Sequence, residues 1–329
     1  MPRPASRRGI VASVAFICAA VALGGTAGQV YAHAALQTSV PSANSILEVG
    51  PSEIVLQFDE AVETALTSIV VYDARSTPIP LDTPVSGAGD NIVQATVPST
   101  SASLMIDGVY AVIWRVTSAD GHVVDGAFSF QIGTSAAGGG QELIDQVRDG
   151  AAADPAVRWW YGIARFLSLF GAITLVGGGW WLIGGPPEIL RRRRSRWMTL
   201  VGWIALLVGS AAAFALFAAQ AIAGSLSDAL AADRWGDVAT TQTGRMILVR
   251  IALAVALGAL LVLRRHRTQG WWRGAAGAAG LLTLVTFSAS GHANAQQPAS
   301  LWVSVDLAHL AAITLWRSEE HTSELQSPC

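Results

Sequence analysis

The sequence predicts two parts in one chain: an all-β Greek-key barrel or sandwich, followed by an α-helical domain that spans a membrane several times. Three observations predict this order. Short segments in which apolar and polar residues alternate fill the first third of the chain, and long apolar segments begin near Trp159. The chain starts with basic residues and an apolar run, which is typical of a secreted protein. The formal charge of −2 gives no reason to expect nucleic acid as a partner.

The N-terminus has the pattern of a secretory signal peptide, which we assign to residues 1–32. Arg3, Arg7 and Arg8 precede an apolar run that is shorter than the ~20 residues of a membrane-spanning helix. Small residues and the triplet Val-Tyr-Ala follow, which fits the usual cleavage pattern. Cleavage after this triplet would make His33 the first residue of the mature protein.

Residues 33–133 are predicted to form the β domain. Alternating or β-branched segments are predicted as strands: 54–59, 67–73, 92–97, 110–117 and 127–132. Pro, Gly, Ser and Asp fill the gaps between them, as expected for turns. In segment 110–117 the period of two predicts that even-numbered residues point into the core and odd-numbered residues point outside. A segment of this length is enough for one core.

Residues 134–157 are predicted to be a linker, with a Gly-rich start and a polar stretch, 141–150, that can form a surface helix. Residues 158–316 are predicted to be the membrane domain. Its apolar segments give the expected spans: 159–184, 197–223, 246–263, 271–290 and 301–316. Tryptophan pairs bracket the first span, as in an interfacial aromatic belt.

The charges of the loops predict which ends of the spans face the cytoplasm. The loops 191–196 and 264–273 are rich in arginine, so the positive-inside rule predicts that both lie in the cytoplasm. The loop after the second span carries Asp228, Asp233 and Asp237 and then falls outside. We therefore expect a multi-pass protein of a bacterial cytoplasmic membrane with its β domain on the external, periplasmic side, in agreement with the signal peptide.

Residues 317–329 resemble the translation of a sequencing-library adapter, and we interpret this tail as non-biological. The span before it has a length of only ~24 Å, so the natural protein is expected to be longer. Cys18 lies in the signal peptide and Cys329 in the tail, so no disulfide is predicted in the mature protein. His321 lies in the tail too and is excluded as a metal ligand.

Two features of the β domain suggest a metal site. An N-terminal His33 would offer its α-amine and its Nδ1 to one metal ion, and such nitrogen ligands suit Cu(II). The triplet Asp120-Gly121-His122 adds a carboxylate and a second imidazole. Each feature also has a simpler interpretation, namely a histidine on a frayed terminus and an Asp-Gly turn. Together they supply the nitrogen and oxygen donors of a four-ligand site.

The first domain resembles a known family. HAALQTSVPSANSIL (33–47), PSEIVLQF (51–58) and GVYAVIWRVTSADGHVVDGAFSFQI (108–132) are similar to the CopC family of periplasmic copper-binding proteins. The resemblance implies a Greek-key β barrel that binds Cu(II) through its N-terminal histidine and its Asp-Gly-His motif. In this sequence the matching residues are His33, Asp120 and His122.

The membrane half resembles the CopD family, which is often fused behind CopC. TGRMILVRIAL (243–253), FSASGHA (287–293) and VDLAHLAAITLW (305–316) carry the likeness. The likeness ends at the fifth helix, so the CopD part is expected to be truncated.

The β domain is expected to bind Cu(II) only. Met105 is its one methionine after signal cleavage, it has no cysteine, and soft thioether and thiolate ligands are what select Cu(I). Met105 itself is expected in the core. The predicted cofactor is therefore Cu(II).

Asp306 and His309 are candidate copper ligands in the membrane, because residues three apart share a helix face and ionisable groups in a membrane usually face a polar path. His292, at the external end of the fourth span, can extend this path. The alternative for Asp306 and His309 is a hydrogen bond that only holds helices together, and the alternative for His292 is a loop histidine that binds no metal. Arg165 and Arg250 lie at a similar depth and are interpreted as structural, with a charge pair to Asp306.

The predicted function is not enzymatic: it is external Cu(II) binding coupled to copper transport or homeostasis across the membrane. Copper ions and membrane lipid are the expected partners. The sequence shows no nucleotide-binding motif, so transport would need a gradient, a reductant, or a redox or metallochaperone partner. Two alternatives stay open: a copper monooxygenase with an N-terminal histidine brace, which Asp120 disfavours by filling a position that oxygen needs, and an adhesion or interaction module without metal.

Overall fold

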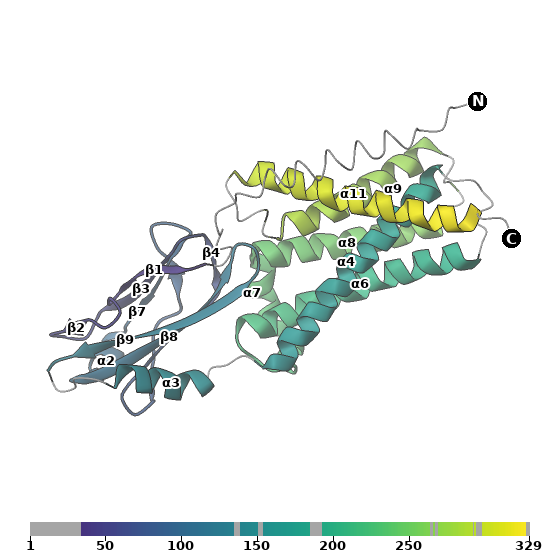
Figure 1. Ribbon diagram of the computed structural model, residues 1–329. Coiled ribbons are helices and arrows are strands. Elements are labelled where there is room, and N and C mark those ends of the chain that lie inside the picture. The colour runs from purple at the N-terminus through teal and green to yellow at the C-terminus, as the bar shows by residue number, and fades with distance from the viewer. Residues whose placement is uncertain are drawn as a thin grey trace. The chain divides into compact units, whose positions relative to one another are not determined.

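The computed structural model describes residues 34–134, 139–150, 154–184, 193–263, 266, 269–291, 293 and 298–326. Within these residues a β domain comes first and long helices follow, in the predicted order (Figure 1). The predicted signal peptide, His33 and His292 lie outside the described residues.

The β domain consists of two sheets. The four-stranded sheet has the order β1 (Leu36–Val40), β3 (Glu53–Phe58), β7 (Ile92–Thr96) and β6 (Val85–Ser86). The five-stranded sheet has the order β2 (Ile46–Leu47), β9 (Val123–Ile132), β8 (Gly108–Ser118), β4 (Val62–Tyr72) and β5 (Pro78–Ile79). Neighbouring strands are antiparallel except β2 and β9, which are parallel. Every predicted strand is confirmed.

The core of the β domain lies between the two sheets, which makes the domain a sandwich. The Phe58 and Trp114 rings meet edge to face at 5.2 Å, and the Tyr110 and Phe130 rings stack at 5.4 Å. Met105 lies after the short helix α2 (Ser99–Ala102) and is only 7% exposed, so its predicted core position is confirmed. Alternating residues of the long strands fill the rest of the core: Ile54, Leu56, Val112, Val116, Phe128 and Ile132.

The outer face of β8 differs from the prediction, because odd-numbered residues on this face are buried as well. Ala111 and Ile113 pack against α3 (Gly140–Gly150), which turns its apolar side chains toward the sheet. Arg115 is also buried, and its Nη2 atom lies 3.8 Å from Oδ1 of Asp125. The stretch predicted as a linker thus contains a helix that covers one face of the sheet. The apolar residues of that helix are Leu143, Ile144 and Val147.

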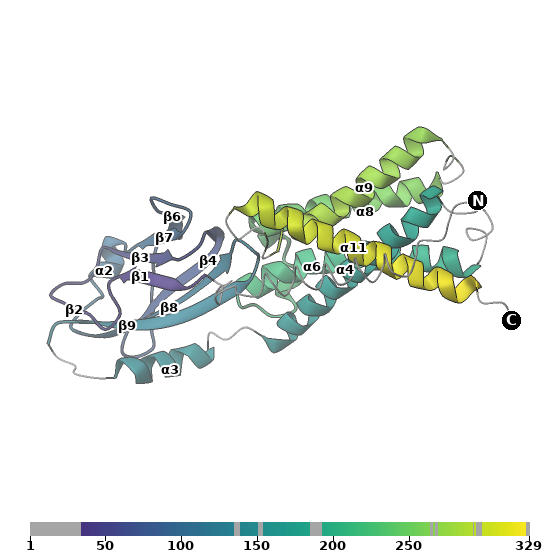
Figure 2. The same cartoon turned by 45° about the horizontal axis from the view of Figure 1, so that its top comes forward.

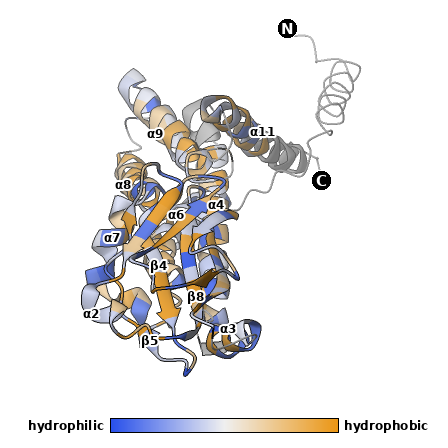
Figure 3. Ribbon diagram, turned by 90° about the vertical axis from the view of Figure 1, so that its left-hand side faces the viewer, coloured by the Kyte–Doolittle hydropathy of each residue, from blue (hydrophilic) through white to orange (hydrophobic). Residues whose placement is uncertain are grey.

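The helical part contains the long helices α4 (Pro155–Gly184), α6 (Arg193–Ala221), α8 (Gln242–Val262), α9 (Gly270–Ser288) and α11 (Ala299–Gln326). The short elements η1 (Asp228–Leu230), η2 (Ala232–Arg234) and α7 (Trp235–Thr240) connect α6 to α8. Among the described residues, three stretches are long and apolar enough to cross a membrane, namely Pro155–Gly178, Arg193–Ala221 and Gln242–Val262. Figure 3 colours the chain by the hydropathy of each residue. Three of the five predicted spans match these stretches, and the described residues also contain a shorter apolar helical stretch, Ala299–Thr314.

Helices α4 and α6 approach each other closely through small residues. A Cβ atom added to Gly209 of α6 would lie 2.5 Å from the backbone nitrogen of Ser168 on α4. The hydroxyl groups of Ser168 and Ser210 hydrogen-bond across the same contact at 2.8 Å. Small residues and interhelical hydrogen bonds are typical of helices that pack within a membrane.

The β domain contacts the helices near the start of α8. The backbone N–H of Gln242 donates to Oε1 of Glu63 in β4 at 2.5 Å. Leu66 of β4 packs in one apolar cluster with Tyr161 of α4 and Phe217 of α6. This end of the five-stranded sheet is therefore held against the helices, and Figure 2 shows β4 and β8 reaching the helical part.

Candidate metal centre

The turn between β8 and β9 presents the predicted Asp120-Gly121-His122 triplet. Gly121 has a φ of +81°, which glycine adopts without the steric cost of a Cβ atom. Backbone hydrogen bonds close the turn: Gly121 N–H donates to Ser118 O at 2.9 Å and Ser118 N–H donates to His122 O at 2.8 Å. The two strands and the glycine together place the side chains of Asp120 and His122 on one side of the turn.

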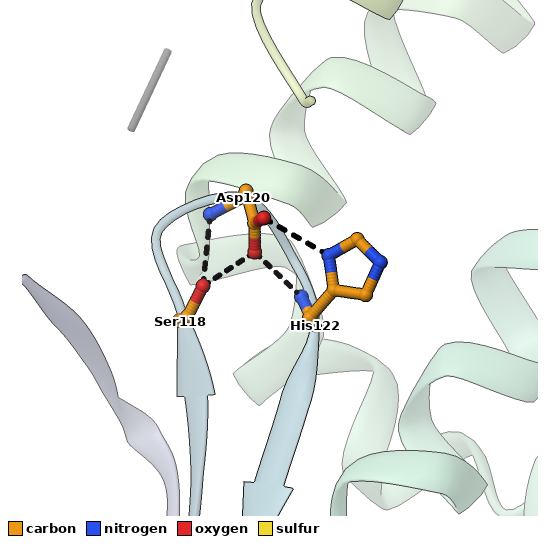
Figure 4. A network of polar contacts seen from close by, with 3 residues as sticks. All are labelled: Ser118, Asp120 and His122. Carbon is orange, nitrogen blue, oxygen red and sulfur yellow. Dashed lines mark hydrogen bonds and ion pairs between the residues drawn. The ribbon is translucent and has the colours of Figure 1, made fainter. Parts of the chain in front are cut away.

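The Asp120 carboxylate organises this turn (Figure 4). Its Oδ1 atom accepts a short hydrogen bond from the Ser118 hydroxyl and a second one, of 3.0 Å, from the His122 backbone N–H. Its Oδ2 atom lies 3.0 Å from Nδ1 of His122. The structure therefore brings together two of the three residues predicted for the main metal site.

The charge of Asp120 is stabilised where it is buried. Burial alone would raise the pKa of its carboxyl, but the hydrogen bonds from His122 and Ser118 outweigh burial and hold this pKa well below its usual range. The Asp120 side chain is 0% exposed, whereas the His122 side chain is 32% exposed. The imidazole is thus partly exposed, whereas its Nδ1 atom and Oδ2 of Asp120 are both buried.

The Asp120–His122 pair has the spacing that two neighbouring metal ligands need. Nitrogen and oxygen ligands lie roughly 2.0–2.2 Å from a divalent ion such as zinc, so two ligands at a right angle are about 3 Å apart. The 3.0 Å between Oδ2 and Nδ1 matches this spacing. One carboxylate and one imidazole also form the donor set that suits Cu(II). The pair supplies two donors, and among the described residues no group of three or more His, Cys, Asp or Glu side chains is placed to hold a metal ion, so the predicted site needs a further ligand.

The chain next to His33 runs to the same end of the sandwich. Ala35 N–H donates to Oδ1 of Asp59 at 2.7 Å, and Asp59 N–H donates to Ala35 O at 3.0 Å. Two residues further, Ala61 O accepts a 3.1 Å hydrogen bond from the N–H of Ala119, which adjoins Asp120. Ala34 is fully buried in the core. These contacts bring Ala35 to the region of the turn, and His33 itself lies outside the described residues.

Glu60 is a residue of this region that the sequence analysis missed. Burial raises the pKa of its carboxyl, and the nearby charges of Asp120 and Asp59 raise it further. A sequence signal existed, because two adjacent acids directly follow an apolar strand. Glu60 therefore adds a second carboxyl group next to the Asp120–His122 pair.

The membrane path predicted from Asp306, His309 and His292 stays a prediction, because His292 lies outside the described residues. Asp306 is half-buried and His309 is exposed on α11. The predicted charge pair of Asp306 with Arg165 or Arg250 is wrong for the described residues. Neutral groups satisfy Arg250 instead: its Nε donates to Thr286 Oγ1 at 2.9 Å and its Nη2 donates to Thr286 O at 3.0 Å.

Family comparisons match both halves of the chain. The CopC domain matches residues 36–133, and the N-terminal domain of copper resistance protein D-like proteins matches residues 153–302. A solved structure of CopC from Methylosinus trichosporium OB3b is 26% identical, with a TM-score of 0.28, and covers 32% of this chain and 100% of that chain.

Three curated relatives are similar to parts of the chain. Copper transport protein CutJ of Bacillus subtilis (strain 168) is 31% identical over 130 residues, which are 39% of this chain and 23% of CutJ. Protein YobA of Escherichia coli (strain K12) is 32% identical over 103 residues, and copper resistance protein C of Pseudomonas syringae pv. tomato is 31% identical over 106 residues. Each of these two alignments covers 31% of this chain and 81% of the relative.

The chain thus spans less than a quarter of the length of CutJ but most of the two shorter relatives, which align over about the length of the β domain. With the matched domains in this order, the chain belongs to the copper resistance proteins of the CopC family, and its CopC domain is followed by a copper resistance protein D-like domain.

Proposed function

We propose that the β domain captures Cu(II) outside the cytoplasmic membrane and that the helical domain takes part in moving copper across it. The observation that carries this proposal is the 3.0 Å contact between Asp120 and His122, at the end of the sandwich where Asp59 holds Ala35. After signal cleavage, His33 would be two residues before Ala35. Its amine and imidazole would then join Asp120 and His122 around one ion.

The donor set supports Cu(II) over Cu(I). His33, Asp120 and His122 offer nitrogen and oxygen atoms, which suit Cu(II), whereas Cu(I) prefers thioether and thiolate sulfur. The sulfur of Met105 is packed in the core of the domain, where it is not available to an ion at the turn. The bound ion would be cargo that the site holds with high affinity and later releases.

Three apolar helices and the copper resistance protein D-like domain support a membrane location. The domain limits follow the sequence: a signal peptide at 1–32, the β domain at 33–133, a linker at 134–157 and the membrane domain at 158–316. The arginine-rich loops support a position of the β domain outside the cytoplasm. Asp306, His309 and His292 form the proposed path in the membrane, and the relative CutJ is named a copper transport protein.

Copper titration of the full chain in detergent tests the proposal. We expect one tightly bound Cu(II) per mature chain, with loss of tight binding in His122→Ala. His266→Ala is the matched control, because His266 lies between α8 and α9, far along the chain from the turn, and should bind copper as the wild type does. Tight binding that survives His122→Ala would contradict the site. Ascorbate-driven peroxide formation by the copper-loaded protein would favour the monooxygenase alternative.

A further inference from the structure

A cavity of about 160 Å³ lies among α4, α6, α8 and α9, and Asp120 of the β8–β9 turn also lines it. Its volume is close to that of cavities of ~150 Å³ that hold benzene-sized ligands. The polar residues of its lining are Asp120, Tyr161, Arg165, Thr243, Arg250 and Ser290. The cavity adjoins the candidate metal centre, since a Cβ atom on Gly121 would lie 2.5 Å from Oγ1 of Thr243.

Arg250 brings a buried positive charge to this cavity. The residue is 4% exposed, its Nη2 donates to Ser290 Oγ at 3.2 Å as well as to Thr286 O, and its guanidinium lies 3.5 Å from the centre of the Phe287 ring. These partners are all uncharged, and no carboxylate among the described residues forms an ion pair with Arg250. A buried charge without a counter-charge is costly, so an anion in the cavity would stabilise it.

Thr243 gives a second and independent indication of a ligand. Its side chain lines the cavity, the residue is 4% exposed, and within the described part of the chain its hydroxyl has no hydrogen-bond partner. Buried hydroxyl groups in native proteins are normally hydrogen-bonded. Arg165, which lies over the Tyr161 ring at 5.6 Å, adds a second guanidinium to the lining.

The charges of the lining favour an anion over a cation. The lining contains two guanidinium groups and one carboxylate. The carboxylate, Asp120, would repel an anion, but it already interacts with the Ser118 hydroxyl and with His122. Guanidinium groups present planar pairs of donors that match the oxygens of phosphate. A metal cation in this cavity would instead be repelled by both arginines.

We propose that this cavity binds a phosphate group, held by Arg250 and Arg165 and by the hydroxyl of Thr243. The group comes either from free inorganic phosphate or from the headgroup of a phospholipid. This site goes beyond copper capture and does not depend on it, since all three binding residues belong to the helical domain. It lies directly behind the turn that carries Asp120 and His122.

The test uses the full chain, purified without phospholipid in a sugar-based detergent, with a chelator that removes copper. Inorganic phosphate is titrated at constant ionic strength while the thermal unfolding midpoint is measured. We expect a saturable rise in the midpoint for the wild type. Half-saturation should require at least tenfold more phosphate in Thr243→Val and Arg165→Gln, and the rise should vanish in Arg250→Gln.

Arg245→Gln and Arg158→Gln are the matched controls, because both arginines are exposed and lie on α8 and α4 outside the cavity lining. Both should respond to phosphate as the wild type does. If Arg250→Gln fails to fold, Thr243→Val, which keeps the shape of the side chain, and Arg165→Gln carry the test. The absence of a saturable rise in the wild type, or the same rise in all variants, would overturn the proposal.

A second arm identifies the source of the phosphate group. Short-chain phosphatidylglycerol below its micellar concentration replaces inorganic phosphate in the same titration. If the lipid produces the rise at lower concentration than phosphate, and the same variants lose it, the headgroup is the ligand. If only inorganic phosphate produces the rise, the free ion is the ligand.

Discussion

The Oδ2 atom of Asp120 and the Nδ1 atom of His122 lie 3.0 Å apart at the tip of the β8–β9 hairpin. Only Gly121 separates these residues in the sequence, and its positive φ lets the chain turn so that both side chains meet. The Ser118 hydroxyl and the His122 backbone N–H fix the other carboxylate oxygen. The contact therefore presents two ligands at a suitable spacing.

Asp120→Asn should destabilise the β domain at neutral pH. Because its folded-state pKa is depressed, the ionised carboxylate contributes stability that is present above its unfolded pKa of about 3.9 and is lost as pH falls. We expect the free energy of unfolding to fall by about 1–3 kcal/mol at pH 7, and the difference in this free energy between the variant and the wild type to shrink below about pH 4. Urea unfolding of residues 33–150, which include the covering helix α3, measures it.

The control for this measurement is Asp82→Asn, because Asp82 is exposed and its backbone N–H donates a hydrogen bond to Thr96 O. It should change stability little at either pH. A constant difference between Asp120→Asn and the wild type from pH 7 to pH 3 would contradict a stabilising role for the charge.

Acidification should weaken copper binding. Imidazole and amine nitrogens must be deprotonated to bind a metal ion, so binding releases protons. We expect a lower affinity at pH 4.5 than at pH 7, together with proton release in calorimetric titrations that use buffers of different ionisation enthalpy. Equal affinity at both pH values would argue against histidine ligands.

Gly209→Ala should destabilise the helical domain. The added Cβ would lie 2.5 Å from the backbone of Ser168, which forces α4 and α6 apart. Overpacking of this kind costs about 1–3 kcal/mol, so the thermal midpoint in detergent should fall. Gly162→Ala on α4 is the control, because its Cβ would meet no atom within 4 Å. An equal response of both variants would show that close packing at Gly209 is unimportant.

Asp306→Asn and His309→Ala should abolish copper accumulation by the full-length protein and leave copper binding by the β domain intact. Both residues lie on one turn of α11, which is not part of the β domain. Ser304→Ala, at an exposed position of the same helix, should transport normally. The amount of folded protein is measured before transport. If both variants transport as much copper per folded molecule as the wild type, Asp306 and His309 are packing contacts and not copper ligands.

Much of the fold follows from local patterns in the sequence. The alternation around Tyr110 and Phe128 identifies strands, and long apolar runs identify the helices, because both patterns report which side chains leave water. The burial of Ala111 and Arg115 could not be predicted in this way. Their face of β8 is covered by residues 140–150, which are polar overall and concentrate their apolar side chains on one side.

The site was predictable only in part. The triplet Asp120-Gly121-His122 shows which ligand atoms are available and predicts a turn. Because a single residue separates Asp120 from His122, the sequence also limits the distance between these two residues. The neighbourhood of Glu60 depends on which strand ends meet in three dimensions, and the neutral partners of Arg250 depend on helix packing. Neither follows from spacing along the chain, and so the expected pair with Asp306 was wrong.

The most direct test of the proposed copper site adds one glycine in front of His33 in the secreted β domain, residues 33–150. A free terminus lets the amine and the imidazole of His33 bind as a chelate, and the extension removes the amine from that position. Cu(II) affinity is measured by competition with a chelator, and electron paramagnetic resonance counts the nitrogen ligands. We expect the extended domain to fold normally, to lose one nitrogen ligand and to bind Cu(II) roughly 10²–10⁴-fold more weakly. Equal affinity and an unchanged spectrum would show that His33 does not complete the Asp120–His122 site.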